Sequence, residues 1–269
     1  MKRAVSALAA ALLAAVLVPA AASAADLKVG VTASPLRSPT CPANAQGIAC
    51  TIILQQVTAY ETLRDGVANP DTIRQSGVIS SFTLGLAGTN LITPSVIAAR
   101  DQEYGGPPEA QLTALLPTGT SQNPTYRVAA ESDVVKLRGE LGKVAEFPLT
   151  TPLPVVRGEI LALTVPTWAP VLSIEQNTTK FAYAQSRVKG STVLTIPATT
   201  TTPATRKRVS TCIAPRTTNF AQVVVGELSG YSCVYPGTRI EYSALEITTP
   251  GGFTSQARKH RAAKRHRKG

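Results

Sequence analysis

Turn-forming residues constrain this chain more than any other feature of its sequence. The 20 prolines and 19 glycines are spread along the 269 residues, and no long amphipathic pattern survives between them. The intervening segments are short and rich in β-branched and aromatic residues, which is typical of strands bounded by turns. The clearest segments are residues 51–60, 77–86, 125–137, 159–165, 171–176, 180–186, 220–229 and 239–248. This pattern predicts an all-β protein, an antiparallel β-sandwich with a jelly-roll-like arrangement.

Residues 92–104 are the best candidate for a helix. The same residues would also suit a strand that leads into the polar loop 100–109. The sequence leaves both alternatives open.

The amino-terminal residues have the composition of a secretory signal peptide. Lys2 and Arg3 precede an uncharged apolar run over residues 4–18, and Ala22, Ser23 and Ala24 supply the small residues of a cleavage site. The run is too short to span a bilayer. We therefore expect a signal peptide at 1–24, a single β-sandwich domain at 25–250, and export to the cell envelope or beyond it.

The four cysteines form two local pairs in the sequence, Cys41 with Cys50 and Cys212 with Cys233. An exported protein meets oxidising surroundings, where disulfides are the usual state of paired cysteines. Three connectivities are possible, and pairing of near neighbours closes the shortest loops. No Cys-x-x-Cys spacing supports a zinc site instead.

The net charge of +11 is concentrated at the carboxyl end. We expect residues 251–269 to form a disordered tail that attracts anionic polymers, such as those of a cell wall, or an anionic lipid surface. The same cations could hold nucleic acid without sequence specificity, although the tail has no aromatic residue for base stacking. The candidate polyanion-binding residues are Arg258, Lys259, Arg261, Lys264, Arg265, Arg267 and Lys268.

Both histidines, His260 and His266, lie in this tail. The predicted domain therefore has no imidazole for a Ser-His-acid arrangement or for a typical catalytic zinc site. No phosphate-binding or dinucleotide-binding motif is present either. The sequence does not favour an enzyme, and it implies no metal and no cofactor.

Two pairs of acids have the spacing that would place both carboxylates on one face of a strand: Asp101 with Glu103, and Glu131 with Asp133. A carbohydrate-cleaving enzyme needs two carboxyl groups that face each other across a groove, one protonated and one ionised. The loop 100–109 could alternatively hold a calcium ion through its oxygen atoms. Ordinary solvated surface residues are the simpler explanation of both patterns, and we favour it.

Trp168 is the candidate for carbohydrate binding. It lies between prolines, where an exposed ring could stack on a sugar, and Tyr183 and Tyr231 could extend such a platform. A single tryptophan is also common in protein cores.

The order of these segments resembles a group of secreted β-sandwich proteins of unknown function from high-GC Gram-positive bacteria. The resemblance rests on the Cys41-to-Cys50 loop, "SGVISSFTL", "PVVRGEILAL", "RIEYSALEI" and the basic carboxyl end. It covers roughly residues 41–247. It implies a compartment and a fold, and it carries no catalytic residues.

Three functions remain open from the sequence. The first is a secreted, non-enzymatic β-sandwich protein that associates with the cell envelope through its polycationic tail. The second is a carbohydrate-binding or carbohydrate-cleaving module, and the third is a non-specific extracellular nucleic-acid binder. The sequence does not indicate an oligomeric state.

Overall fold

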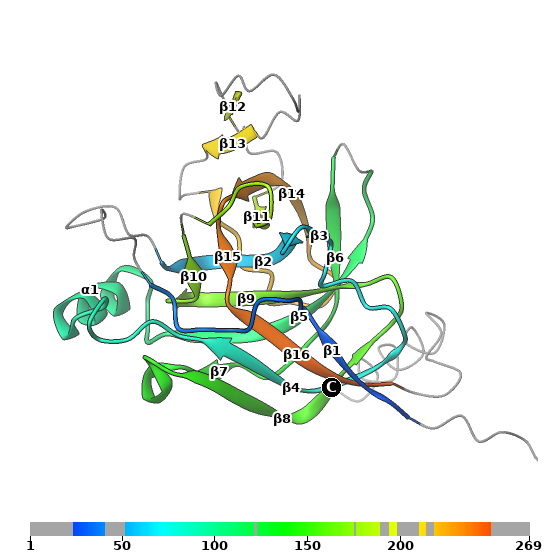
Figure 1. Ribbon diagram of the computed structural model, residues 1–269, viewed down its shortest axis with the longest axis horizontal. Coiled ribbons are helices and arrows are strands. Elements are labelled where there is room, and N and C mark those ends of the chain that lie inside the picture. The colour runs from blue at the N-terminus through cyan, green and yellow to red at the C-terminus, as the bar shows by residue number, and fades with distance from the viewer. Residues whose placement is uncertain are drawn as a thin grey trace, which may run out of the picture.

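Antiparallel strands make up 52% of the residues that the structure describes, and the fold is all-β as the sequence predicted. The computed structural model describes residues 24–40, 52–120, 123–174, 176–188, 194–197, 210–213 and 218–248 (Figure 1). The strands are β1 (Asp26–Val29), β2 (Leu54–Arg64), β3 (Val67–Ala68), β4 (Gly77–Gly85), β5 (Glu109–Pro117), β6 (Thr125–Glu131), β7 (Val135–Lys136), β8 (Val144–Val155), β9 (Ile160–Ala169), β10 (Leu172–Ser173), β11 (Ala182–Arg187), β12 (Leu194–Pro197), β13 (Ser210–Ile213), β14 (Leu228–Pro236), β15 (Arg239–Ile240) and β16 (Tyr242–Thr248). The helices are α1 (Pro94–Glu103) and the short 3₁₀ helix η1 (Arg138–Glu140).

Six strands close into a barrel in the order β11-β14-β6-β5-β9-β2. The ring closes because β11 pairs with β14 along one edge and with β2 along the other. Tyr183 of β11, for example, lies opposite Tyr235 of β14 and Glu61 of β2. Closure leaves these strands with no unpaired edge to present to other chains.

A second sheet, in the order β1-β16-β4-β8, covers the barrel on the side of β2, β5 and β9. Figure 1 shows these four strands below β5 and β9. The main hydrophobic core fills the space between this sheet and the barrel wall, and it includes Phe82, Leu84, Leu153, Leu163 and Val165. The molecule is thus sandwich-like, with a closed barrel as one of its two layers.

Strand β9 shows how the two layers share residues. Leu161, Leu163 and Val165 face the four-stranded sheet, whereas Ile160 and Ala162 belong to a second apolar cluster. All six barrel strands contribute to that second cluster, which places it inside the barrel. Because both faces of β9 are covered, its sequence is a nearly continuous apolar run without the alternation of a half-exposed strand.

The barrel interior also contains hydroxyl groups that bond to one another. The hydroxyl of Thr164 lies 2.8 Å from that of Thr58 and 2.6 Å from that of Thr113. Nearby, the hydroxyls of Tyr60 and Tyr126 are 2.9 Å apart. Buried polar groups satisfied in this way avoid the cost of desolvation without a partner.

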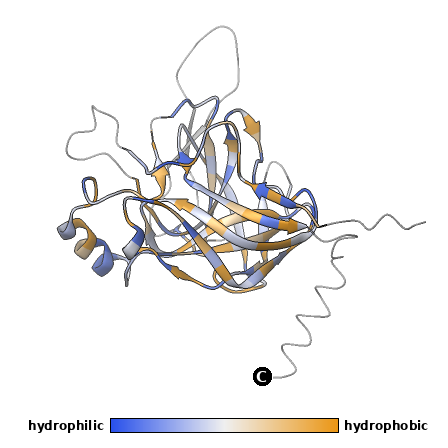
Figure 2. Cartoon of the chain, turned by 60° about the horizontal axis from the view of Figure 1, so that its bottom comes forward, coloured by the Kyte–Doolittle hydropathy of each residue, from blue (hydrophilic) through white to orange (hydrophobic). Residues whose placement is uncertain are grey.

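Residues 92–104, which the sequence left undecided, form helix α1. The hydroxyl of Thr93 caps the helix by accepting from the amide of Val96, and Pro94 occupies the first turn. Ile97 is the buried residue of the helix and packs in a cluster with Trp168. In Figure 2 the helix is hydrophilic at both ends and hydrophobic in between. No helix among the described residues is long and apolar enough to cross a membrane.

Three predicted strands are shorter than expected, and one of them, residues 125–137, is divided into β6 and β7. Of the described residues in 171–176, Leu172 and Ser173 form a strand, and of residues 220–229 only the last two belong to β14. Residues 220–227 are irregular because their backbone and side chains bond to the barrel and to one another, rather than to a partner strand. The β-branched composition of this segment was therefore misleading.

Strand β8 was missed because it contains Pro148, Pro152 and Pro154. Strand β8 is an edge strand and pairs only with β4 in its sheet. At positions where the backbone N–H would point away from β4, a proline costs no hydrogen bond of the sheet. The prolines also keep this exposed edge from pairing with another chain.

We predict that Gly85→Ala destabilises the fold. An added Cβ at Gly85 would overlap the carbonyl oxygen of Arg37 and lie 2.8 Å from the carbonyl carbon, so backbone would have to move. We expect a loss of about 1–3 kcal/mol in the free energy of unfolding, measured by urea denaturation. Gly139→Ala is the control because nothing lies within 4 Å of its added Cβ. Equal stability of the two variants would contradict the close approach at Gly85.

Candidate functional site: a buried network of carboxylates and arginines

Trp168 does not form an exposed platform. Its side chain is fully buried in the cluster beneath α1, and its indole N–H donates to Asp101 Oδ1 at 3.1 Å. Tyr183 and Tyr231 are also buried, the first stacked on Tyr235 and the second inside the barrel. The prediction of a sugar-stacking face at Trp168 is therefore corrected, because no face of the ring is open to a ligand.

The acid pair in loop 100–109 does not lie on one face of a strand. Asp101 and Glu103 belong to α1, where a spacing of two places side chains on different sides of the helix. Asp101 forms an ion pair with Arg138, and Glu103 forms one with Arg100. The described residues contain no cluster of three or more His, Cys, Asp or Glu side chains that could hold a metal ion.

The second acid pair is also separated. Glu131 is the last residue of β6, and Asp133 lies beyond the strand. The structure instead brings Glu131 near Glu227, which precedes β14. Burial raises the pKa of Glu131, Glu227 raises it further, and the side chain of Gln111 lowers it. Neither predicted pair therefore forms facing carboxylates as its spacing suggested.

The tail cations and two of the cysteines, Cys41 and Cys50, lie outside the described residues. Cys233 lies buried on β14 and is not a free cysteine. Strand β13, which carries Cys212, lies beside β14. The side chain of Cys212 is not among those that the structure describes. The pairing of Cys212 with Cys233 therefore stays a prediction.

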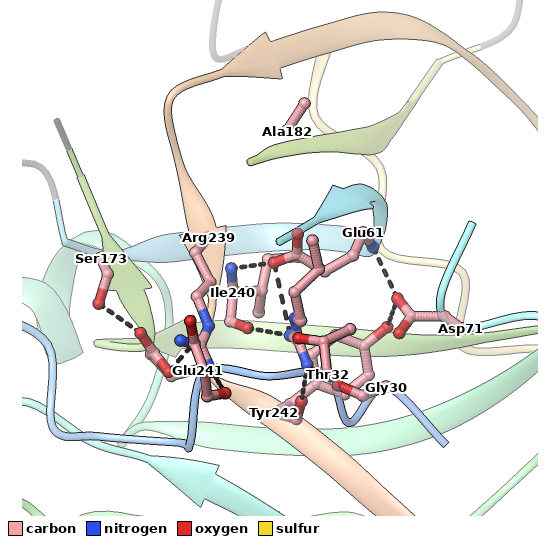
Figure 3. A network of polar contacts seen from close by, with 12 residues as sticks. Gly30, Thr32, Glu61, Asp71, Ser173, Ala182, Arg239, Ile240, Glu241 and Tyr242 are labelled. Carbon is pink, nitrogen blue, oxygen red and sulfur yellow. Dashed lines mark hydrogen bonds and ion pairs between the residues drawn. The ribbon is translucent and has the colours of Figure 1, made fainter. Parts of the chain in front are cut away.

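The densest group of ionisable side chains lies where β2 meets β15 and β16 (Figure 3). The network contains three carboxylates and two guanidinium groups, all almost completely buried. Its charged members are Glu61, Arg64, Asp71, Arg239 and Glu241. Such groups are rarely buried unless they are paired and hydrogen-bonded.

Arg64 lies at the centre of this network. Its guanidinium donates to the backbone carbonyls of Ile240 at 2.6 Å and Tyr242 at 2.9 Å, and to that of Gly30. Its Nη2 is also 3.5 Å from Glu61 Oε1. One side chain of the barrel thus joins the end of β1 to the junction of β15 and β16.

Glu61 and Asp71 surround this guanidinium with negative charge. The Glu61 carboxylate accepts from the amide of Ile240, and Asp71 Oδ2 accepts from the amide of Glu61 at 2.7 Å and from the Tyr242 hydroxyl. Burial raises the pKa of Asp71 to about 6 even though Arg64 and the Tyr242 hydroxyl lower it. Burial also raises the pKa of Glu61, against the attraction of Arg64.

Glu241 and Arg239 extend the network toward the surface. Glu241 Oε1 accepts from the Ser173 hydroxyl at 2.6 Å, and Glu241 Oε2 lies 3.3 Å from Arg239 Nε. Arg37, which is half-exposed, approaches the same carboxylate to 3.7 Å. The carboxylate of Glu241 therefore has a cation on two sides.

Residues 30–40, which follow β1, pass over this network and are tied to it. Arg239 donates to the carbonyls of Ser34 at 3.1 Å and Pro35 at 3.0 Å. Asp65 accepts from the hydroxyl of Thr32 and from both the amide and the hydroxyl of Ser34. These bonds lower the pKa of Asp65 despite the opposing effect of burial. The segment has no regular secondary structure. Side chains of neighbouring elements therefore make the hydrogen bonds to its backbone that a partner strand would otherwise make.

This arrangement can stabilise the fold, but it offers no site for a reaction. No substrate could reach Glu61 or Asp71 without displacing residues 30–40 or β16, because both carboxylates are fully buried. The sequence did not predict the network. The one signal in the sequence was the acid Glu61 and the base Arg64, three residues apart in "TAYETLR". That spacing is also common on solvated strands.

Comparison with known proteins identified no relationship: no protein-family model matches the chain, and no curated protein or solved structure matches it significantly.

We predict that Arg64→Ala destabilises the protein by about 3–5 kcal/mol, because it leaves buried carboxylates without their cation. Unfolding in urea at neutral pH would measure the loss. Arg74→Ala, at an exposed arginine, is the matched control and should change stability by less than about 0.5 kcal/mol. Similar stability of the two variants would show that the network is not a major source of stability.

Glu246 generates a second prediction, at the other end of β16. It is 1% exposed, its Oε1 has no hydrogen-bond partner among the described residues, and burial raises its pKa to about 7. A carboxyl that binds its proton more tightly when folded stabilises the protein below its unfolded pKa, and this contribution is lost as pH rises to about 7. Glu246→Gln should therefore be more stable than the wild type at pH 8, by up to about 3 kcal/mol, and similar to it at pH 4.

Urea unfolding across this pH range tests the prediction, with Glu109→Gln at a partly exposed glutamate as the control. A constant difference between Glu246→Gln and wild type at every pH would contradict the raised pKa of Glu246.

Proposed function

We propose that the protein is an exported, non-enzymatic β-sandwich protein that associates with the cell envelope through its polycationic carboxyl end. The ligand would be an anionic cell-wall polymer or an anionic lipid surface. The domain at 25–250 would serve as the folded body, and the cations Arg258 to Lys268 would make the contact. The resemblance to secreted β-sandwich proteins is part of this proposal.

The observation that carries the proposal is the distribution of charge. The described residues hold more Asp and Glu than Lys and Arg, whereas the chain as a whole carries +11. The excess positive charge therefore belongs to other segments, above all to the seven cations that follow residue 257. Residues 25–250 as a whole carry a net charge of only +2 and so have little long-range attraction for polyanions, which makes the attraction depend mainly on the carboxyl-terminal cations.

The state of the carboxylates also supports a role in binding over a role in catalysis. Glu61, Asp71 and Glu241 are buried against arginines, and Asp101 and Glu103 form ion pairs around α1. Carboxylates held in this way contribute to stability and are not free to face a substrate. The burial of Trp168 counts against the alternative of a carbohydrate-binding or carbohydrate-cleaving module, because the ring cannot stack on a sugar.

Export would place the four cysteines in oxidising surroundings, where disulfides form. We propose that Cys41 pairs with Cys50 and that Cys212 pairs with Cys233. A bridge between Cys212 and Cys233 would attach the β12–β13 hairpin, whose second strand lies beside β14, to the barrel. Closing such a loop typically adds about 2–4 kcal/mol of stability.

We predict that replacing the seven tail cations by glutamine reduces binding to a purified cell-wall fraction by at least about 100-fold at low salt, because each cation near an anionic surface contributes on the order of 1 kcal/mol. Co-sedimentation measures the bound fraction. High salt should release the wild-type protein to the same extent. The matched control replaces Arg206, Lys207 and Arg208 by glutamine and should have the smaller effect. Retention of the tail variant on walls at high salt would contradict the proposal.

A further inference from the structure

The turn that precedes β14 presents three consecutive valines to solvent. Val223, Val224 and Val225 are 40%, 55% and 52% exposed. The other exposed large hydrophobic residues of the described chain occur singly, among them Val67 and Val144. Single exposed apolar residues are normal on protein surfaces, so three consecutive ones set this turn apart from the rest of the described surface.

The turn is held in one conformation by its own polar groups. The carboxylate of Glu227 accepts from the amides of Val223 at 2.9 Å and Val224 at 3.2 Å. The amide of Glu227 donates back to the carbonyl of Val224 at 3.1 Å, and Gly226 adopts a φ of +98°. Glycine is suited to this conformation because it has no Cβ.

The base of the turn is fastened to the barrel. The amide of Gly226 donates to the carbonyl of Val128 at 2.9 Å, and the amide of Val128 donates to the carbonyl of Glu227 at 2.9 Å. On the other side, the buried Gln222 donates from its amide to the Thr58 hydroxyl and accepts at its side chain from Tyr231. The valines are therefore presented by a rigid support and do not fold back onto the core.

We propose that this valine turn, residues 223–225, is a lipid-contacting tip that inserts its side chains into the interface of a bilayer. This function is separate from the proposed polyanion contact of the tail and does not depend on it.

The chemistry of the turn favours lipid over a protein partner. Three half-exposed valines cover far less than the roughly 1,000 Å² that a specific protein interface buries, so they cannot by themselves hold a second copy of the chain. They carry no aromatic or polar group that would give directional recognition. A short aliphatic tip suits a fluid apolar phase, which needs no complementary shape.

The charged side chains around the turn carry both signs, since Glu131 lies near Glu227 and Arg127 lies at the base, and this mixture suits a zwitterionic surface. The Glu227 carboxylate is engaged by two amides, and Arg127 donates to the carbonyl of Gly226 at 3.1 Å while its side chain is exposed. The guanidinium is thereby placed at the base of the turn, where it could approach lipid phosphates. Salt would screen Arg127 as it screens the tail, whereas the apolar contact of the valines would persist.

Flotation with phosphatidylcholine vesicles at high salt tests the proposal on the full chain. We expect the wild type to bind weakly and reversibly, and we expect the double variant V224N/V225N to lose on the order of tenfold or more in partition coefficient. The matched control, V67N/V144N, changes two similarly exposed valines elsewhere and should bind as the wild type does. Circular dichroism would verify that all three proteins are folded.

A second measurement locates the tip directly. A tryptophan placed by Val224→Trp should be quenched by brominated phosphatidylcholine, whereas one placed by Val67→Trp should not. The native Trp168 is buried and provides the same background in both variants. Equal quenching of the two variants would overturn the proposal.

Other outcomes are equally decisive. Absence of wild-type binding to phosphatidylcholine at high salt, or undiminished binding of V224N/V225N, would overturn the lipid contact. A change in oligomeric state caused by V224N/V225N would assign the turn to self-association instead. The protein with its tail cations replaced by glutamine should bind these vesicles normally, so failure of the tail proposal would leave this result unchanged.

Discussion

The guanidinium of Arg64 joins parts of the chain that lie far apart in sequence. It bonds to carbonyls from the end of β1 and from the junction of β15 and β16, while its own backbone belongs to the barrel. A buried guanidinium requires nearby negative charge, which explains why Glu61 and Asp71 are buried with it. Those carboxylates in turn bond to Ile240, Tyr242 and the backbone of β2. The attachment of the covering sheet to this part of the barrel therefore depends on one cation and its acids.

The fold class could be predicted because it follows from local composition. The segments around "GVISSFTL", "EILALTV" and "RIEYSALEI" became β4, β9 and β16. The continuous apolar character of β9 has a reason that a single sequence does not show, namely that its two faces contact the barrel interior and the second sheet. Closure of the barrel could not be predicted from the sequence either, because it pairs β2 with β11, more than a hundred residues apart.

The candidate sites were harder to predict, for three different reasons. Trp168 is surrounded by prolines, which favoured an exposed loop, yet its ring anchors α1 through Asp101. Asp101 is paired with Arg138 from another element and Glu103 with Arg100 of its own helix, and a spacing of two residues carries no information about those partners. Residues 223–225 have strand-like composition, but the carboxylate of Glu227 folds them into a turn. Composition predicts what a residue prefers, and distant contacts decide which preference prevails.

The pairing of β1 with β16 has a consequence for the order in which the protein folds. Asp26 to Val29 pair with Ala244 to Ile247, so the first strand of the described residues has its only described sheet partner in the last. During synthesis, the early strand must wait unpaired until almost the whole chain has followed it. Contacts of such high sequence separation slow folding. Strands β4 and β8 can pair earlier, but the second sheet can be completed only late, after the barrel strands have been synthesised.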